Sequence, residues 1–432
     1  MTYSPRGRTL LPVIGGARTD LERGAPASVL PRMRALVMVF WCLLLLAGCG
    51  GGSSPSASSS ESPSPRERAA QGQPVLGQKG DEEPAGPALG FPVFATKNTT
   101  RVGGADPVAD AAGVAQAVFP SRSEDTRPPA VVLVDQDDWR AGIAAAQLTA
   151  APVRAPVLLT EGSDLPKATA DALGKLRPTG SKQAGGAQVI RVGDVAKPDG
   201  LKSTDLSAGN PAATARAIDR LHSAAAKKPS GAVLVASADR PDFAMPAAGW
   251  AAKAGDPVLW AGRDTLPPET RAAITAHGKP RIFVLGPAAV ISDKVLGELR
   301  RLGSVKRIEG PDPVTNAIAF ARFTDGNFGW GVTDPGHGLV FASTTRTLDA
   351  AAGAPLSGSG TYGPLLLVTE AQALPQAVQD YLLDIQPGYD KDPVRGVYNH
   401  GWLMGDEAAI SADVQSRIDT LLEIQPVDTG GS

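Results

Sequence analysis

The chain has 432 residues, 42% of them hydrophobic, and a formal net charge of −2. That length suits about two to four packed domains, and the near-neutral charge gives no basis for a nucleic-acid partner, which normally needs a basic patch. Four histidines and two cysteines are present, and both cysteines fall in one apolar N-terminal segment. This inventory fits neither a zinc site nor a disulfide framework, so we expect no metal site and no cofactor.

The first distinct segment is an apolar run over residues 35–47, preceded by Arg34. The run is too short to cross a bilayer as a helix, which takes about 20 residues, but it suits the central part of a secretory signal. It ends in the tetrapeptide LAGC (46–49), which resembles the lipobox of bacterial lipoproteins. The resemblance implies cleavage before Cys49 and acylation of that cysteine, which would anchor the protein to the outer side of the cell membrane.

The segments around this signal differ from it in composition. Residues 1–32 are rich in arginine, proline and glycine and resemble no signal n-region, so they are expected to be disordered or to precede a true start at Met33. Residues 33–48 then form the lipoprotein signal peptide. Most of residues 49–96 lacks large apolar side chains and cannot bury enough surface to offset the entropy of ordering, which predicts a disordered tether. Residues 425–432 are expected to form a disordered tail.

Three similar stretches then follow one another, with their first prolines 101 and 107 residues apart. They are APVLLTEGSDLP (155–166), DPVLWAGRDTLP (256–267) and GPLLLVTEAQALP (363–375). Each is preceded by an apolar strand and a small-residue helix, and is followed by a polar helix, a further strand and a glycine turn. A proline-led helix opens each unit. The Leu-Pro pair predicts proline in the first turn of the polar helix, where its missing N–H costs nothing.

The strands of these units are continuous Val/Leu runs without alternation, which is typical of parallel sheets covered by helices on both faces. Strand and helix alternate at a spacing that predicts right-handed crossover connections. We therefore predict an α/β protein of three tandem, small, open and mostly parallel sheet units flanked by helices. The predicted boundaries are 97–204, 205–310 and 311–424.

The repeated unit resembles the cell wall-binding repeat of type 2, a surface module of Gram-positive and actinobacterial cells. The resemblance is carried by RVGGADPVADAAGVAQAV (101–118), APVLLTEGSDLPKATADAL (155–173) and DAAAGAPLS (349–357). In that family the modules occur in threes, are arranged about a pseudo-threefold axis, and attach proteins non-covalently to anionic or glycan polymers of the wall. The resemblance covers roughly residues 97–424 and implies the same arrangement here.

This chain departs from the family pattern in several places. The family's aspartate before the small-residue helix is present as Asp349 in the third unit, whereas Arg140 and Phe243 occupy its place in the first and second units. The glycine pair after the last strand is reduced to one glycine, and an aromatic and glycine-rich insertion, 324–338, interrupts the third unit. These departures leave the fold prediction unchanged and weaken any transfer of polymer specificity.

No catalytic motif stands out, because GxSxG, HExxH and phosphate-loop patterns are all missing from the sequence. Asp135, Asp137 and Asp138 follow a predicted strand at the end where parallel sheets bind ligands. They form a solvated acidic loop, a cation site or a general base, and the sequence favours the first. The protein is predicted not to be an enzyme.

Binding of an anionic polymer calls for arginines near strand ends or helix N-termini. Arg101, Arg191 and Arg346 are the first candidates for contact with polymer, followed by Arg140 and by Asp349.

The leading hypothesis is a lipid-anchored, extracytoplasmic envelope protein that faces the cell wall and binds wall polymer through three repeats. One alternative is a solute-binding lipoprotein of a transporter, which would have two lobes and a cleft. Another is an envelope hydrolase, for which the three units leave no room for a further domain.

Overall fold

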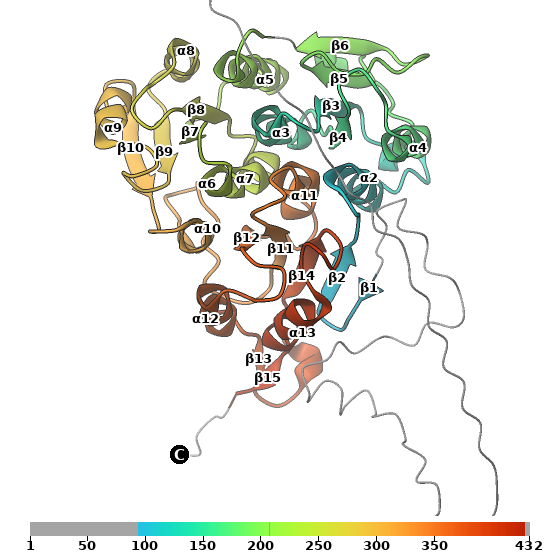
Figure 1. The fold of residues 1–432 in the computed structure, drawn as a ribbon, viewed down its shortest axis with the longest axis vertical. Helices are drawn as coiled ribbons and strands as arrows, with labels where there is room; N and C mark the ends of the chain where they lie inside the picture. Colours follow the sequence, from blue (N-terminus) through green and yellow to red (C-terminus); the bar gives the residue numbers. More distant parts are fainter. Residues whose placement is uncertain (1–93, 207, 428–432) are drawn as a thin grey trace, which may run out of the picture. The chain divides into compact units, whose positions relative to one another are not determined.

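The computed structural model describes residues 94–206 and 208–427. Cys49, the predicted signal 33–48, residues 1–32 and most of the predicted tether 49–96 lie outside the described residues. Within the described part, three sheets of parallel strands carry α-helices on their faces (Figure 1). The predicted fold class, an α/β protein with small, open and mostly parallel sheets, is confirmed.

The three sheets share one strand order, in which the second strand of the unit is followed by the first, third and fourth. The first sheet has the order β4-β3-β5-β6, the second β8-β7-β9-β10, and the third β12-β11-β14-β2 with β1 at its outer edge. The strands of the first sheet are β3 (Val131–Asp135), β4 (Val157–Thr160), β5 (Val189–Val192) and β6 (Ser203–Leu206). Those of the second are β7 (Ala232–Ser237), β8 (Val258–Ala261), β9 (Arg281–Leu285) and β10 (Ser304–Ile308). Those of the third are β11 (Gly338–Ser343), β12 (Leu365–Val368), β14 (His400–Met404), β2 (Thr99–Val102) and β1 (Phe94–Ala95).

The third sheet takes its last strand from the N-terminal end of the described chain. Strand β2 pairs in parallel with β14, with Thr100 opposite Trp402 and Val102 opposite Met404. It holds the place that β6 and β10 hold in their own sheets. The segment 97–204, expected to form the first unit, therefore contributes a strand to the third sheet, because the chain leaves β14 into a helix and supplies no later strand for that edge.

The residues at both ends of the three-sheet array differ from the prediction. Residues 94–95, expected in the disordered tether, form β1 and pair antiparallel with β2. Residues 425–426, expected in the disordered tail, form β15 (Gln425–Pro426) and pair with β13 (Gly388–Tyr389). In both cases backbone hydrogen bonds to a neighbouring strand order a segment whose composition alone predicts disorder.

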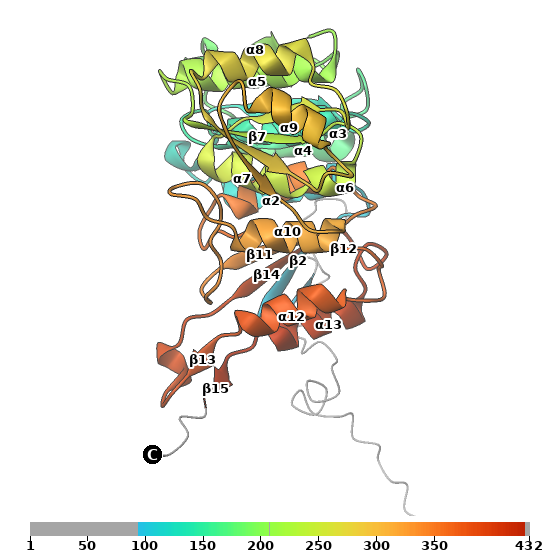
Figure 2. The same ribbon diagram turned by 90° about the vertical axis from the view of Figure 1, so that its left-hand side faces the viewer.

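The last strand of each sheet leads directly into the proline-led helix of another unit. These helices are α2 (Pro107–Val118) after β2, α5 (Pro211–Ala225) after β6 and α10 (Pro313–Arg322) after β10. Each has proline at its start, and Asp106, Asn210 or Asp312 caps it by accepting a hydrogen bond from a backbone N–H of the first turn. Figure 2 shows α10 between α6 (Pro241–Ala244) of the second unit and the third sheet. The chain thus passes from unit to unit through a strand and a capped helix.

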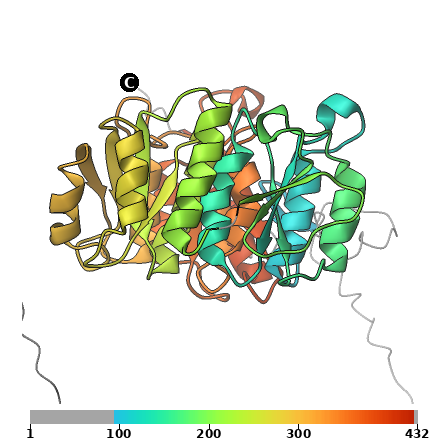
Figure 3. The same ribbon diagram turned by 90° about the horizontal axis from the view of Figure 1, so that it is seen from above.

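Three helices made mostly of small residues meet between the sheets (Figures 1 and 3). They are α3 (Trp139–Ala145), α7 (Pro246–Ala254) and α11 (Asp349–Ser357). A Cβ atom on Gly142 would lie 2.4 Å from Cδ2 of Leu348, and one on Gly249 would lie 2.8 Å from Oγ of Ser357. Glycine at these positions therefore lets the helices of different units approach closely.

The polar helices that follow the Leu-Pro pairs cover the outer faces. They are α4 (Lys167–Leu176), α8 (Pro268–Ala276) and α12 (Gln376–Asp384), and their N-cap residues are Pro166, Pro267 and Pro375. The predicted proline thus stands at the N-cap in each. The Thr169 and Thr270 hydroxyls each donate a 2.6 Å hydrogen bond to a carbonyl of the underlying strand. The remaining helices are α9 (Asp293–Leu299) and α13 (Ala412–Leu421), with short 3-10 turns at 124–126, 146–149, 182–184 and 393–395.

The aromatic insertion 324–338 is part of the hydrophobic core. The ring of Phe328 stacks on that of Phe283 at 3.5 Å, and Trp330 meets Trp250 edge to face at 5.4 Å. The insertion of the third unit thereby packs on the second. Among the described helices, none combines the length and apolar character that crossing a membrane requires.

We predict that Gly310→Ala destabilises the fold by about 1–3 kcal/mol, since a Cβ there would lie 2.4 Å from the backbone nitrogen of Asn316, which has no room to move. Gly174→Ala in α4 is the matched control, because a Cβ there meets nothing within 4 Å and alanine favours a helix. Thermal unfolding should show a lower Tm for Gly310→Ala and an unchanged or higher Tm for the control. Equal Tm values for both variants would contradict the close packing of β10 against the start of α10.

Candidate functional site

The carboxyl ends of parallel strands in one sheet meet at one edge, and such edges are where open α/β sheets bind ligands. We call this the carboxyl edge of a sheet. In each of the three sheets it is formed by the loops that follow the strands, among them the loops after β3, β7 and β11. Arg140, Arg346 and Asp349 lie in the loops or helix starts that follow β3 and β11. Arg101 and Arg191 stand near the carboxyl ends of β2 and β5. All of the predicted polymer contacts therefore fall on carboxyl edges, although on those of different sheets.

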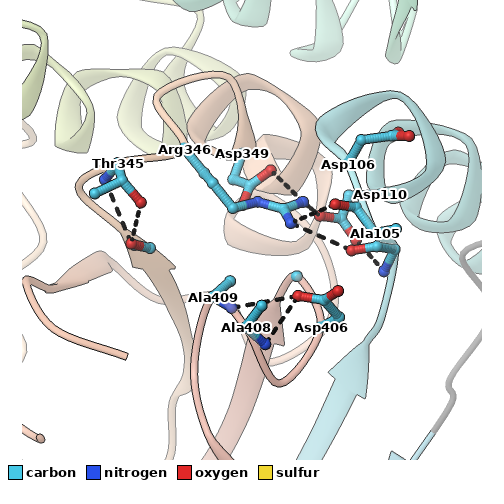
Figure 4. A network of polar contacts seen from close by, with 12 residues as sticks. Ala105, Asp106, Asp110, Thr345, Arg346, Asp349, Asp406, Ala408 and Ala409 are labelled. Atoms are coloured by element: carbon cyan, nitrogen blue, oxygen red, sulfur yellow. Dashed lines mark hydrogen bonds and ion pairs between the residues drawn. The ribbon is translucent and has the colours of Figure 1, made fainter. Parts of the chain in front are cut away.

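Arg346 is the centre of a polar network that joins the third unit to the start of α2 (Figure 4). Its Nε donates to Asp349 at 2.8 Å, and its Nη2 forms an ion pair with Asp110. Its Nη1 donates to the carbonyls of Gly104 at 3.3 Å and Ala105 at 3.2 Å. One guanidinium thus ties residues from α11, α2 and the loop before α2.

The two carboxyl groups around Arg346 are completely buried. Burial and the neighbouring charge of Asp349 raise the pKa of Asp110 well above its ordinary value. Burial also raises the pKa of Asp349, to about 6, although Arg346 opposes that rise. The arrangement is therefore a cation facing two carboxyl groups, of which Asp110 keeps its proton more readily and shares a hydrogen bond with Asp349.

Asp110 is one of the residues that the sequence analysis missed. Its Oδ1 accepts a 2.8 Å hydrogen bond from the backbone N–H of Gly104, just as Oδ1 of Asn316 accepts one from Gly310 at 3.1 Å. Both residues stand four positions after the capping aspartate of a proline-led helix. The recurrence of an Asp or Asn at this position of a proline-led helix was a signal available in the sequence. Only the structure shows that Arg346 contacts Asp110.

Arg101 holds a turn rather than facing solvent. Its side chain is 2% exposed, and its Nε donates to Gln415 at 3.0 Å. Its Nη atoms donate to the carbonyls of Gly405 at 3.0 Å, Asp406 at 2.8 Å and Ile410 at 2.6 Å. With its donors taken by protein acceptors, Arg101 would reach a polymer only if this turn rearranged.

Arg191 does the same for the first sheet. Its Nε donates to the carbonyls of Val195 at 3.0 Å and Ala196 at 3.1 Å, and Nη1 pairs with Asp205 at 2.8 Å. In the second sheet Arg307 donates to the carbonyl of Gly286 at 2.7 Å. Each sheet therefore uses one arginine to secure the glycine turn that follows its third strand, and Arg307 is the member that the sequence analysis did not identify.

Arg140 links the first unit to the second. Its guanidinium lies 4.4 Å above the ring of Trp139, and its Nε donates to the carbonyl of Ala238 at 2.7 Å. The acidic loop before it serves the backbone: Asp138 caps α3 by accepting from Ala141 at 2.9 Å, and Asp135 accepts from the N–H of Asp137 at 2.9 Å. These contacts are those of a structured loop.

A cavity of about 420 Å³ opens at the carboxyl edge of the first sheet, beside the Arg346 network. Asp106, Gln136, Glu161 and Lys167 line it, together with Ala105, whose carbonyl Arg346 holds. Carboxylates, an amide and an ammonium group of this kind can bind hydroxyl groups and cationic or anionic substituents of a polyol. In the described ranges, 94–206 and 208–427, no cluster of three or more His, Cys, Asp or Glu side chains is arranged to hold a metal ion.

We predict that Asp110→Asn flattens the pH dependence of stability. The folded pKa of Asp110 lies above its ordinary 3.8, so the folded protein binds this proton more tightly than the unfolded chain does. The associated stability is fully present below the unfolded value and is lost as pH rises through the folded one. Asparagine keeps an acceptor for Gly104 and a donor for Asp349 but offers Arg346 no acceptor, so urea unfolding at pH 7 should show a stability below that of wild type and above that of Asp110→Ala.

Asp110→Ala should instead cost about 2–3 kcal/mol, because it leaves Gly104 and Arg346 without a partner. Asp413→Asn, at an exposed position in the first turn of α13, is the control for loss of a carboxylate. An Asp110→Asn variant as unstable as Asp110→Ala at pH 7 would contradict the protonated state proposed for Asp110.

Comparison with known proteins bears on the geometry above. The family model described as cell wall binding domain 2 (CWB2) matches residues 206–296 and 307–415. A search of curated proteins finds no match to the chain.

Two solved structures share the fold. Cwp6 from Clostridium difficile superposes with a TM-score of 0.60 at 16% sequence identity, over 81% of this chain and 51% of that one. Cwp8 from Clostridium difficile superposes with a TM-score of 0.57 at 17% identity, over 75% of this chain and 52% of that one. The chain spans about half the length of these proteins, and at such identities the likeness concerns the fold. The family model described as cell wall binding domain 2 thus matches two of the three units of this chain, the second and the third.

Proposed function

We propose that this protein binds a cell wall polymer non-covalently and that binding, rather than catalysis, is its role. The observation that carries the proposal is the family match over residues 206–296 and 307–415. Cell wall association outside the cytoplasm follows from that family. The finer proposal is that the polymer is an anionic or glycan polymer of an actinobacterial-type wall, and that no nucleic acid is bound.

We further propose that the protein uses three repeats, although the family model matches two. The family model does not match the first repeat. Its support is the common strand order of the three sheets, because the first sheet repeats the order of the two matched ones. The proposed repeats are 97–204, 205–310 and 311–424, with β2 of the first segment completing the third sheet. A solute-binding lipoprotein would instead be built from two lobes around a cleft.

Anchoring is a separate part of the proposal. The LAGC tetrapeptide supports acylation of Cys49, with residues 33–48 as a signal peptide and the following segment as a tether. An acylated N-terminus would hold the repeats at the outer face of the membrane, where a tether lets them reach the wall.

The carboxyl edge is our proposed contact surface. Arg346 and Asp349 set the loop beside the 420 Å³ cavity, and Arg191 and Arg101 secure the glycine turns of two sheets. Of the predicted set, Arg140, Arg191 and Arg346 are half-buried, whereas Arg101 and Asp349 are buried. Their joint effect is to hold the edge in one shape, while exposed groups such as Lys167 meet the polymer.

The test is sedimentation of the purified protein with isolated cell walls. We expect co-sedimentation at low salt, weakened at high salt if the polymer is anionic, since exposed charge pairs are screened. Lys167→Gln should lower the bound fraction, whereas Lys175→Gln, at the other end of the same helix, should leave it unchanged. Failure of the unmodified protein to sediment with walls at any salt concentration would count against the function itself.

A further inference from the structure

A second cavity, of about 430 Å³, lies at the opposite ends of the strands from the carboxyl edge. It opens where β7 and β9 begin, beside the last turn of α7. The charged and polar side chains in its wall are Lys228, Ser230, Lys253, Asp256, Arg281 and Asn327. None of them was identified in the sequence analysis, and the cavity is of the size that small-molecule sites usually have.

The acidic group in this wall is already satisfied by protein donors. The Asp256 carboxylate accepts from the Ser230 hydroxyl and from Nε1 of Trp250, the latter at 2.8 Å. Arg281 is likewise held, because its Nη1 donates to the carbonyl of Asp325 at 2.7 Å and its Nη2 to Oδ1 of Asn327 at 2.6 Å. The hydrogen bonds of Asp256 and Arg281 to protein groups fix these side chains in the cavity wall.

The two lysines of the wall are different. Among the residues that the structure describes, neither Lys228 nor Lys253 forms an ion pair, whereas most of the partly buried arginines do. Lys228 is exposed at the rim. Lys253 is half-buried, and burial lowers its pKa. A half-buried ammonium group without a carboxylate is costly, and an anion entering the cavity would supply the missing partner.

Aromatic rings hold the Lys253 ammonium in place. Its Nζ lies 3.9 Å from the ring centre of Tyr362, 4.9 Å from that of Trp330 and 5.1 Å from that of Trp250. Such cation–π contacts fix the position of the charge without neutralising it. The cation is therefore positioned, partly desolvated and still in need of a counter-charge.

The third unit's insertion builds this arrangement. Trp330 and Asn327 both belong to the segment 324–338. Nε1 of Trp330 and Oγ of Ser357 are buried and have no hydrogen-bond partner within the described part of the chain. Both side chains lie against α7, since a Cβ on Gly249 would be 2.8 Å from Oγ of Ser357 and 3.5 Å from Cζ2 of Trp330. The insertion therefore supplies Asn327 to the cavity wall and the Trp330 ring to the surroundings of Lys253, whereas the two unpartnered atoms lie buried behind the wall.

We propose that this cavity is a binding site for an anionic sugar unit, whose acidic group pairs with Lys253 and Lys228 while its hydroxyls meet the amide of Asn327. The inference rests on the proposed function, because a wall polymer is the source of such a unit. The shared chemistry is a carboxylate or a phosphate on a sugar, and charge-assisted hydrogen bonds to either are stronger than those to a neutral sugar. A polymer of many units would engage this site and the carboxyl edge together and gain avidity.

The experiment is calorimetric titration of the purified protein with glucuronic acid, with glucose 1-phosphate and with glucose. We expect binding of at least one acidic sugar, at least tenfold tighter than binding of glucose, and about tenfold weakening in Lys253→Met. Lys228→Met, at an exposed position, gives a second variant with little risk to the fold. Lys182→Met is the control, because that lysine is exposed at the same end of the first sheet. Tm values should establish that all three variants are folded.

The possible results of these experiments separate three questions: which acidic group is bound, whether the cavity is the site, and whether the proposed function is correct. Binding of glucuronic acid alone assigns a uronic acid, and binding of glucose 1-phosphate alone assigns a sugar phosphate. Equal binding of glucose, or acidic-sugar affinities unchanged in both Lys253→Met and Lys228→Met, overturns the site. If neither acidic sugar binds while the protein still sediments with walls, the site is wrong and the proposed function stands. If the unmodified protein binds the acidic sugars but does not sediment with walls, the proposed function is wrong and the site stands.

Discussion

A parallel sheet grows by backbone hydrogen bonds to a further strand, and the way this chain supplies the fourth strand of each sheet organises the rest of the structure. Each of the three sheets ends in a strand that runs straight into the helix of another unit. The third sheet can do so only because β2, at the N-terminal end of the described chain, pairs with β14. The first and third units are consequently joined by backbone hydrogen bonds as well as by side chains, and the third sheet has its fourth strand only through the first segment.

The helices between the sheets make this arrangement compact. Small residues on α3, α7 and α11 allow close approach, and at Gly142 and Gly249 even a methyl group would collide with the neighbouring unit. Where small residues leave little apolar area, the contacts between units include polar ties: Arg346 reaches from the third unit to Asp110, and Arg140 from the first unit to Ala238. Such ties are specific in geometry because a guanidinium has fixed donor directions.

Because these arginines bind acceptors within the protein, they are not free to bind an external anion. Arg101, Arg191 and Arg307 are spent on glycine turns, and Arg346 on two buried carboxyl groups. Lysines line both cavities: Lys167, which pairs with Asp171 at the surface, at the carboxyl edge, and Lys253 at the other end of the strands. Binding at two ends of a repeat array suits a long polymer, because several weak contacts on one ligand add through effective concentration.

The sequence by itself determined the α/β class, the parallel strands and the proline-led and Leu-Pro helices, because these depend on local patterns of apolar, small and helix-starting residues. It also carried the family resemblance. Only the tertiary structure shows that β2 belongs to the third sheet, since the sequence TTRV does not indicate which strand it pairs with. The same holds for the site: the sequence located arginines near strand ends, but whether a guanidinium faces solvent or a carbonyl depends on tertiary contacts, which for Arg101 and Arg346 are made with residues more than 200 positions away. Arg101 bonds residues more than 300 positions along the chain, and Asp110 and Arg346 lie 236 positions apart. Long-range pairing of this kind leaves no local pattern, which is why the charged residues were found and their roles were not.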